Sequence, residues 1–347
     1  MSRSTVLGYA AQAPGSRLEP VTYEAPDLKE GEIRVAVSHC GVCHTDIHGI
    51  EGDFGVFAFP LMPGHEIVGP VTEVGGAVSG LQVGDRVGIG WQGRCCGECE
   101  WCRAGEEHLC QQIADCGTWT PYGGFATSVV VDGRFAYLLP TAMAPEVAAV
   151  LMCAGVAVYP PLREYTTGPG TRVGIVGIGG LGHLGIQFAK ALGCEVTALS
   201  SSPGKEAEAR AFGAEHFLLS TDPAAMESVE YGFDLLLCTS HAGNDWPTLL
   251  MALRKKGRLV LPAFSPVELP LAAGDSASGP AVDLVAHQLS ITGSFLGSRA
   301  DMREMLAFAQ GHGITPRIEL MPMSQVNEAM LRVRRNQARY RVVLVNE

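Results

Sequence analysis

Short stretches of alternating apolar and polar residues fill the first 140 positions, and this alternation is typical of half-buried β-strands. Glu32 to His39 (EIRVAVSH) alternates in this way, and Glu66–Val74 and Arg86–Ile89 are two further runs bounded by glycine-rich turns. Many short strands at close intervals predict an irregular β-barrel or a folded sheet for this part of the chain.

The pattern changes near Ala144. Residues 144–159 are rich in Ala and Val and favour a helix, which Pro160-Pro161 is predicted to end. From Thr171 to about Leu296, apolar runs alternate with helical stretches. The runs are RVGIVGI, EVTALS, HFLLS, FDLLLC, RLVLPA and SITGSF. This alternation predicts βαβ units and a parallel sheet covered on both faces, so the chain is expected to be an α/β protein.

The last part of the chain, 301–347, holds one amphipathic helix (DMREMLAFAQGHG) and a final strand (YRVVLV). We expect this part to pack with the first domain rather than with the parallel sheet. A length of 347 residues is sufficient for two domains that each have their own core.

Composition narrows the classes of function. The net charge of −11 repels phosphate backbones, which makes nucleic acid an unfavourable partner. The start, MSRSTVLGYA, lacks the apolar segment of a signal peptide, and we find no run of about eighteen apolar residues that predicts a membrane span. Eleven cysteines without such a signal favour the reducing cytoplasm, where thiolates bind metals rather than form disulfides.

A cysteine-rich loop, Gly93 to Cys110, gives the strongest local signal (GRCCGECEWCRAGEEHLC). Four of its cysteines have the spacing C-x2-C-x2-C-x7-C: Cys96, Cys99, Cys102 and Cys110. Two-residue gaps let the sulfurs converge on one point, as a closed structural zinc site requires. The alternatives are unpaired or disulfide-bonded cysteines, and Cys95 in place of Cys96 as a ligand; Cys96 gives the more regular spacing.

A glycine-rich sequence lies between the predicted strand RVGIV and the helix LGHLGIQFAKALG: Gly177-Ile178-Gly179-Gly180-Leu181-Gly182. A second strand, EVTALS, follows about twenty residues later. In that context the glycines permit a tight turn and a close approach of the backbone to a pyrophosphate at the helix N-terminus. We therefore predict a dinucleotide site; the alternative is a plain glycine-rich turn.

The end of EVTALS distinguishes NAD from NADP. An acidic residue there would bind the ribose hydroxyls and disfavour a 2′-phosphate. This chain has Ser200, Ser201, Ser202 and Lys205 instead, which can donate hydrogen bonds to a phosphate and neutralise its charge. The hypothesis is a preference for NADP(H); the alternative is that these serines only cap the next helix.

A second set of metal-binding residue types is dispersed along the chain: Cys43, His65, Glu66 and Cys153. Thiolates and an imidazole suit zinc, and a catalytic zinc keeps one position open for water or substrate. Taken singly, a cysteine in an apolar helix, such as Cys153, is more often a small buried hydrophobe than a ligand, and Glu66 suits a surface carboxylate. Spacing alone does not bring these residues together.

Five motifs in order give a resemblance over essentially the whole chain: CGVCHTDIH, PGHE, the four-cysteine loop, LMCAGVAVY and GIGGLGHLG. They resemble the zinc-dependent alcohol dehydrogenases of the medium-chain dehydrogenase/reductase superfamily, and within it the cinnamyl alcohol dehydrogenase group, which includes bacterial NADPH-dependent aldehyde reductases. The resemblance implies a GroES-like catalytic domain, residues 1–154 and 297–347, around a Rossmann domain, residues 155–296.

The resemblance also implies individual roles. Cys43, His65 and Cys153 would bind the catalytic zinc, Glu66 would be a nearby carboxylate able to enter its coordination, and the loop cysteines would bind a structural zinc. Asp46 would orient His65, and Cys40 would be structural. Thr45 would begin a proton relay that His48 connects to solvent, unless His48 is only a surface histidine. His44 and Arg341 would contact the cofactor pyrophosphate, or Arg341 would pair with Glu66.

An apolar, aromatic pocket is the last expectation, with five candidates for its walls: Trp91, Trp119, Phe54, Phe57 and Phe295. Trp119 departs from the family pattern and puts a large indole in a loop that shapes the pocket entrance. The sequence thus predicts a two-zinc, NADP(H)-dependent dehydrogenase for hydrophobic or aromatic aldehydes and primary alcohols. It is expected to be a cytoplasmic homodimer, paired through an edge strand within Leu289–Leu296.

Three alternatives remain. An NAD(H)-dependent polyol or secondary alcohol dehydrogenase is opposed by the serines in place of an acid. A zinc-binding regulatory or nucleic-acid module is opposed by the acidic charge and the glycine-rich fingerprint. A zinc-free quinone reductase of the same fold is opposed by the retention of Cys43, His65 and Cys153.

Overall fold

The computed structural model describes residues 5–113, 117–119, 122–240, 243–263 and 284–346. The chain divides into two compact units. Unit 1 comprises Met1–Val156, Gly297–Gly311 and Thr315–Glu347, and unit 2 comprises Ala157–Leu296 and His312–Ile314. The first segment of unit 1 ends at Val156, two residues after the expected domain boundary at 154. The long segment of unit 2 ends at Leu296, the position expected for the second boundary.

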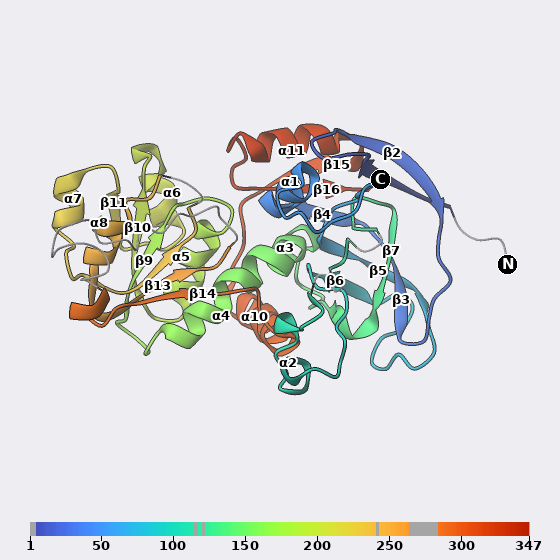
Figure 1. Ribbon diagram of the computed structural model, residues 1–347, viewed down its shortest axis with the longest axis horizontal. Coiled ribbons are helices and arrows are strands. Elements are labelled where there is room, and N and C mark those ends of the chain that lie inside the picture. Colours follow the sequence, from blue (N-terminus) through green and yellow to red (C-terminus); the bar gives the residue numbers. More distant parts are fainter. Residues whose placement is uncertain (1–4, 114–116, 120–121, 241–242, 264–283, 347) are drawn as a thin grey trace. The chain divides into compact units, whose positions relative to one another are not determined.

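Unit 1 is built on an eight-stranded sheet, of which six strands run in the order β15-β16-β4-β5-β3-β7, while β6 pairs with β5 and β8 (Figure 1). Its strands are β3 (Glu32–Ala36), β4 (His39–Val42), β5 (Glu66–Val74), β6 (Arg86–Ile89), β7 (Ser128–Asp132), β8 (Ala136–Leu138), β15 (Ile318–Pro322) and β16 (Arg341–Val345). A separate hairpin pairs β1 (Thr5–Ala11) with β2 (Leu18–Glu24). Because β16 lies antiparallel to β4, the last strand of the chain is a central strand of this sheet.

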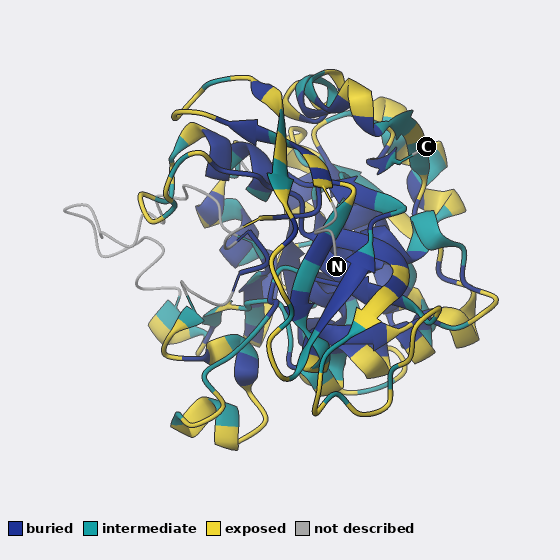
Figure 2. Cartoon of the chain, turned by 90° about the vertical axis from the view of Figure 1, so that its right-hand side faces the viewer, coloured by how far each residue is buried: buried dark blue, intermediate teal, exposed yellow. Residues whose placement is uncertain are grey.

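The core of unit 1 lies between this sheet and its helices. Strand residues such as Ile33, Ile67, Val87 and Val342 are completely buried. Figure 2 shows strands of this part of the chain in the dark blue of buried residues. The helices are α1 (His44–Glu51), α2 (Glu100–Arg103), α3 (Pro145–Val150), α10 (Arg299–His312) and α11 (Val326–Arg334). Short 3-10 turns lie at Glu107–Leu109, Gly133–Phe135 and Met323–Gln325.

The helix that leaves unit 1 differs from the prediction. After α3 the backbone widens into a π-helical turn, Leu151–Gly155, and continues as α4 (Val156–Tyr165) through Pro160 and Pro161. The prolines remove two backbone donors, but their fixed φ is helical and the apolar face around them is buried at Val158, Tyr159 and Leu162. Packing therefore carries the helix past the point at which the prolines were predicted to end it.

The same stretch corrects a second expectation. Pro145–Tyr165 has the length and hydropathy of a membrane-spanning helix, although no such run was expected from the sequence. Of its most apolar window, 83% is buried inside the chain, as in the core helix of a globular protein. Length and composition alone give weak support for a membrane span here.

Unit 2 has the predicted parallel sheet, with the strand order β11-β10-β9-β12-β13-β14 and only parallel pairings. The strands are β9 (Arg172–Val176), β10 (Glu195–Ser200), β11 (His216–Leu219), β12 (Phe233–Cys238), β13 (Leu253–Leu261) and β14 (Ser290–Gly293). Helices α5 (Gly182–Ala191), α6 (Glu206–Ala211), α7 (Pro223–Glu227) and α8 (Trp246–Met251) connect or flank them. The α/β fold class is confirmed.

Candidate active site

The start of α1 holds three predicted site residues in a fixed geometry. Cys43 is the N-cap of this helix, and its sulfur accepts the N–H of Thr45 at 3.5 Å. The backbone N–H of Cys43 donates to the carboxylate of Asp46 at 2.9 Å, which completes a reciprocal capping box. A cysteine followed three residues later by an aspartate is thus a local signal that fixes the sulfur at the helix entrance.

Asp46 also orients His65. Its second carboxylate oxygen accepts the N–H of Gly64 at 2.9 Å and lies 3.0 Å from Nδ1 of His65, and both side chains are buried. A carboxylate at one imidazole nitrogen leaves the other nitrogen to face a metal. Nε2 of His65 is buried and finds no hydrogen-bond partner among the residues that the structure describes. Such an orphaned atom is what a metal ligand shows when the ion is removed.

The four dispersed residues meet in unit 1. One ligand atom from each of Cys43, His65, Glu66 and Cys153 lies within 4.8 Å of all the others, and all four residues are buried. The two sulfurs are 3.9 Å apart, a separation that suits two thiolates on one tetrahedral zinc. Cys153 is placed by the π-helical turn Leu151–Gly155, a distortion that is frequent at functional sites. The donor set therefore fits a zinc ion.

Burial and mutual contacts shift the pKa values of the residues in this cluster in opposite directions. The adjacent Cys153 thiol lowers the pKa of Cys43 well below its usual range, and the same contact raises the pKa of Cys153. Burial lowers the pKa of His65, but the Asp46 carboxylate and the Cys43 sulfur together outweigh burial and raise that pKa overall. A cation at this point would compensate the thiolate and carboxylate charges that burial otherwise penalises.

Glu66 lies beside the cluster in an ion pair with Arg341, and both side chains are buried. Burial raises the pKa of Glu66 to about 7, although the guanidinium opposes the shift. A β-carbon at Gly41 would lie 2.0 Å from Oε2 of Glu66, so a larger residue there would displace the Glu66 carboxylate. Of the two predicted partners of Arg341, the structure has Glu66; a pyrophosphate contact stays a prediction.

The cysteine loop forms a second group of ligands. The sulfurs of Cys96, Cys99, Cys102 and Cys110 all lie within 4.8 Å of one another. Cys95 is not part of the group, in agreement with the choice of Cys96 from spacing. Backbone N–H groups of Gln111 and Cys102 lower the pKa of Cys99 to about 6, which favours the thiolate that a metal needs. The ten cysteines that the structure describes are free, with no disulfide among them.

The glycine-rich turn of unit 2 has the expected geometry. Gly177 has a φ of +86°, and a β-carbon on Gly182 would lie 1.9 Å from the carbonyl oxygen of Gly177. These two positions therefore admit only glycine, one for its conformation and one for close contact. Gly179 and Gly180 lie between them, and Leu181 is the N-cap of α5. The backbone is thus shaped to approach a pyrophosphate.

The residues after β10 form a turn that contacts the glycine-rich sequence. Ser200 is buried, and its hydroxyl accepts the N–H of Ser202 at 3.1 Å, which holds the turn. Ser202 is the N-cap of the 3-10 turn Pro203–Lys205 but makes no side-chain cap hydrogen bond. Ser201 is exposed, and Nζ of Lys205 donates to the carbonyl of Ile178 at 2.5 Å, so the lysine reaches the glycine-rich turn.

Comparison with known proteins gives the family. Residues 29–141 match the model of the alcohol dehydrogenase GroES-like domain, and residues 180–311 match that of the zinc-binding dehydrogenases. A probable formaldehyde dehydrogenase, AdhA of Bacillus subtilis, is 41% identical over 336 residues, which are 95% of this chain and 94% of that protein. The chain belongs to the zinc-dependent alcohol dehydrogenases.

Two solved structures place this dehydrogenase in the medium-chain dehydrogenase/reductase superfamily. A cinnamyl alcohol dehydrogenase of Sorghum bicolor shares 37% identity and a TM-score of 0.89, with 99% of this chain and 98% of that chain covered. CAD from Helicobacter pylori, complexed with NADP(H), shares 26% identity and a TM-score of 0.86, with 99% of each chain covered. The resemblance inferred from the sequence motifs is confirmed.

Aromatic rings form a continuous row beside the catalytic cluster of this dehydrogenase. Trp119 lies 5.5 Å from the ring of His65 and 5.0 Å from Phe57, Phe57 lies 5.9 Å from Phe54, and Phe54 lies 6.0 Å from His48. Three predicted pocket residues are thus in one row. Trp91 packs against Gly117 outside this row, and Phe295 belongs to unit 2.

One functional candidate of the dehydrogenase was missed in the sequence. Asp53 lies 2.7 Å from Nδ1 of His48, and both side chains are partly exposed. Thr45, which is half-buried, has its hydroxyl 3.5 Å from the sulfur of Cys43. The contact between Asp53 and His48 could have been identified from the sequence, because an aspartate follows the histidine by five residues, just past the helix end at Gly52. His44 is the first residue of α1, where its predicted contact with the cofactor stays a prediction.

Proposed function

We propose that this dehydrogenase is an NADP(H)-dependent reductase of hydrophobic and aromatic aldehydes, working reversibly on the corresponding primary alcohols. The observation that carries the proposal is the end of β10, where Ser201, Ser202 and Lys205 stand in place of an acidic residue. They supply donors and a positive charge for a 2′-phosphate. The complex of the Helicobacter pylori CAD with NADP(H) supports this cofactor. The missing acid also opposes an NAD(H)-dependent polyol dehydrogenase.

The aromatic row supports the substrate class. Phe54, Phe57 and Trp119 make the surroundings of His65 apolar and aromatic, which suits an apolar or aromatic aldehyde. The indole Nε1 of Trp119 is buried without a hydrogen-bond partner among the described residues. A substrate oxygen, such as a methoxy or phenolic group, would satisfy this donor.

The chain's own residues account for orientation and proton transfer. When bound by Cys43, His65 and Cys153, zinc supplies Lewis-acid polarisation of the carbonyl. Asp46 fixes the imidazole of His65, and Thr45 holds a hydroxyl at the ligand sulfur, where it can donate a proton to the oxygen of the reduced substrate. His48, held by Asp53 and partly exposed, can return that proton from solvent.

An NADPH-oxidation screen tests the proposal. Purified protein is given NADPH or NADH with formaldehyde, acetaldehyde, octanal and cinnamaldehyde, and kcat/KM is measured for each pair. We expect NADPH to be favoured by about tenfold or more, the worth of one charged phosphate contact, and cinnamaldehyde to exceed acetaldehyde. Equal or better rates with NADH would refute the cofactor assignment. A preference for the small aldehydes would refute the substrate class.

Thr45→Ala tests the proton relay. We expect kcat to fall by about 10²-fold or more because the relay loses its first hydroxyl, while Thr45→Ser retains most of the activity. The zinc content of both variants is measured as a control and should match the wild type. Wild-type turnover in Thr45→Ala would remove Thr45 from the relay.

Assembly and location complete the proposal. β14 is an edge strand of the unit 2 sheet, paired only with β13 among the described strands, and we propose that it pairs with β14 of a second copy in a cytoplasmic homodimer. Light scattering should give twice the chain mass of 36.7 kDa. A mass of one chain at micromolar concentration would exclude the dimer.

A further inference from the structure

The backbone next to the proposed pocket residue Trp119 is hydrogen-bonded to residues 91 and 92, which directly precede the cysteine loop. The N–H of Thr118 donates to the carbonyl of Trp91 at 2.8 Å, and Gln92 and Gly117 form an antiparallel bridge. Thr118 and Trp119 are buried. The position of the indole therefore depends on where the backbone at Trp91 and Gln92 lies.

The side chain of Gln92 connects this backbone to the structural metal cluster. Its Nε2 donates to the carbonyl oxygen of Glu107 at 2.7 Å, and Gln92 is itself buried. The same carbonyl accepts the N–H of Cys110, a ligand of the cluster, at 3.0 Å. The Glu107 carbonyl thus accepts two hydrogen bonds, one from the Cys110 N–H in the cysteine loop and one from the side chain of Gln92.

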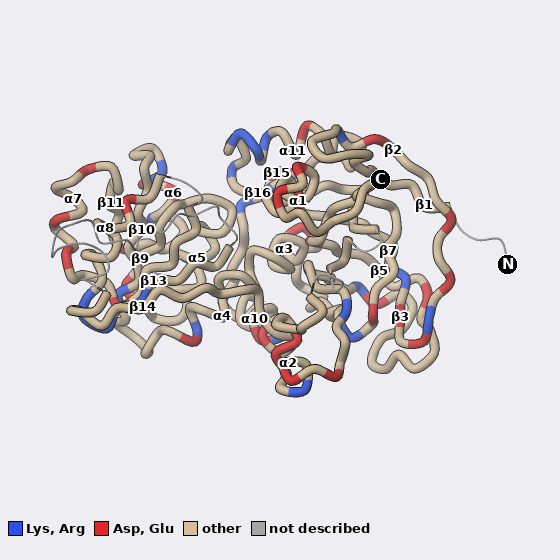
Figure 3. The backbone as a smooth tube through the Cα atoms, viewed as in Figure 1, with Lys and Arg blue, Asp and Glu red and all other residues tan. Residues whose placement is uncertain are grey.

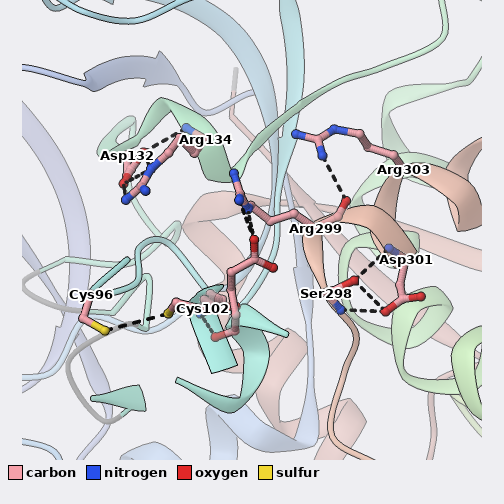
Figure 4. Close-up of polar contacts among 10 residues, drawn as sticks. Cys96, Cys102, Asp132, Arg134, Ser298, Arg299, Asp301 and Arg303 are labelled. Carbon is pink, nitrogen blue, oxygen red and sulfur yellow. Dashed lines mark hydrogen bonds and ion pairs between the residues drawn. The ribbon is translucent and has the colours of Figure 1, made fainter. Parts of the chain in front are cut away.

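Glu107 is in turn fixed to a distant part of unit 1. Its carboxylate is paired with Arg299, whose Nε donates to it at 2.7 Å, and only 3% of Glu107 is exposed. Figure 4 shows Arg299 beside Ser298 and Asp301, whose reciprocal hydrogen bonds cap α10. Figure 3 shows both acidic and basic residues near α2. Because Glu107 is buried in its ion pair with Arg299, it does not exchange this partner for the other charged residues nearby. The carbonyl that Gln92 contacts is therefore a rigid anchor.

We propose that Gln92 is a positioning residue for substrate specificity, which sets the place of Trp119 by tying its supporting backbone to the anchor at Glu107. This inference rests on the proposed role of Trp119 as a pocket wall. Gln92 touches neither substrate nor cofactor in this role. When the Gln92 amide is lost, the Glu107 carbonyl still accepts the N–H of Cys110, so the cysteine loop keeps its position. The backbone that supports Trp119 then loses its hydrogen bond to this loop.

Gln92→Met tests this inference because methionine has a similar shape but no N–H donor. We expect KM for cinnamaldehyde to rise about fivefold, the worth of one buried hydrogen bond, with kcat/KM for formaldehyde within about twofold of wild type. The zinc content should stay at that of the wild type. Gln82→Met, the same change at an exposed position of unit 1, is the matched control and should alter neither.

A double-mutant cycle separates positioning from general damage. In a Trp119→Ala background, Gln92→Met should have no further effect on KM for cinnamaldehyde, because its target is gone. An effect of full size in that background, or an equal effect on both aldehydes, would overturn the inference and leave the proposed function intact. A wild-type KM for cinnamaldehyde in Trp119→Ala would overturn the inference together with the role of Trp119 as a pocket wall. If Gln92→Met does not fold, Gln92→Asn, which keeps the amide but is one methylene too short, is held to the same outcomes.

Discussion

Replacement of Cys43 by alanine is expected to abolish aldehyde reduction, with kcat/KM lower by roughly four orders of magnitude. The change removes one of three ligand side chains that are buried together and leaves His65 and Cys153 to hold the ion alone. Lewis-acid stabilisation of several kcal/mol is lost with the ion. Elemental analysis should show one zinc per chain in place of two, the remaining one in the cysteine loop.

Cys40→Ala is the matched control for this loss. Cys40 is completely buried three residues earlier on β4, and it belongs to neither ligand group. The Cys40→Ala variant should keep both zinc ions and most of the activity. The N-cap contribution of Cys43 is about 1 kcal/mol, so Cys43→Ala should remain folded and its thermal unfolding should shift only slightly. Wild-type activity or two zinc ions in Cys43→Ala would contradict the assigned ligand set.

The cluster around Cys43 shows what the sequence could and could not predict. The residue types predicted zinc, but the ligands come from the start of α1, the segment before β5 and a π-helical turn, which only tertiary structure brings together. The motif order, and hence the family, supplied the connection. The position of Asp46 follows from a local capping box, whereas the contact of Asp53 with His48 depends on how the chain turns at Gly52.

The fold, like the site, could be predicted from the sequence only in part. Runs with a strong apolar pattern, such as Glu66–Val74 and Phe233–Cys238, coincide with β5 and β12. The hairpin β1–β2 was not predicted, since β2 contains Pro20 and four exposed residues that weaken its pattern. The prolines at 160 and 161 were predicted to end a helix, but their neighbours are buried, and tertiary packing outweighed the local preference.

Replacement of Cys102 by alanine is expected to affect stability more than chemistry. Besides the metal site, the lobe from Gly93 to Cys110 is held by the ion pair of Glu107 with Arg299, because α2 has four residues and none is buried. A closed thiolate site supplies about 10 kcal/mol or more of metal-binding free energy that is also folding free energy. Without it, the lobe should unfold and become a site of limited proteolysis, and Tm should fall because this contribution to the free energy of unfolding is lost.

Cys95→Ala provides the control for Cys102→Ala because it is the one cysteine of the lobe outside the ligand group. It should keep two zinc ions, the wild-type Tm and protection of the lobe from protease. Cys102→Ala should keep one zinc ion, at Cys43, His65 and Cys153. Any folded fraction should bind cinnamaldehyde less well, because Gln92 loses its anchor at Glu107 when the lobe unfolds. Two zinc ions and an unchanged Tm in Cys102→Ala would contradict a structural site, and equal behaviour of the two variants would make Cys95 a ligand.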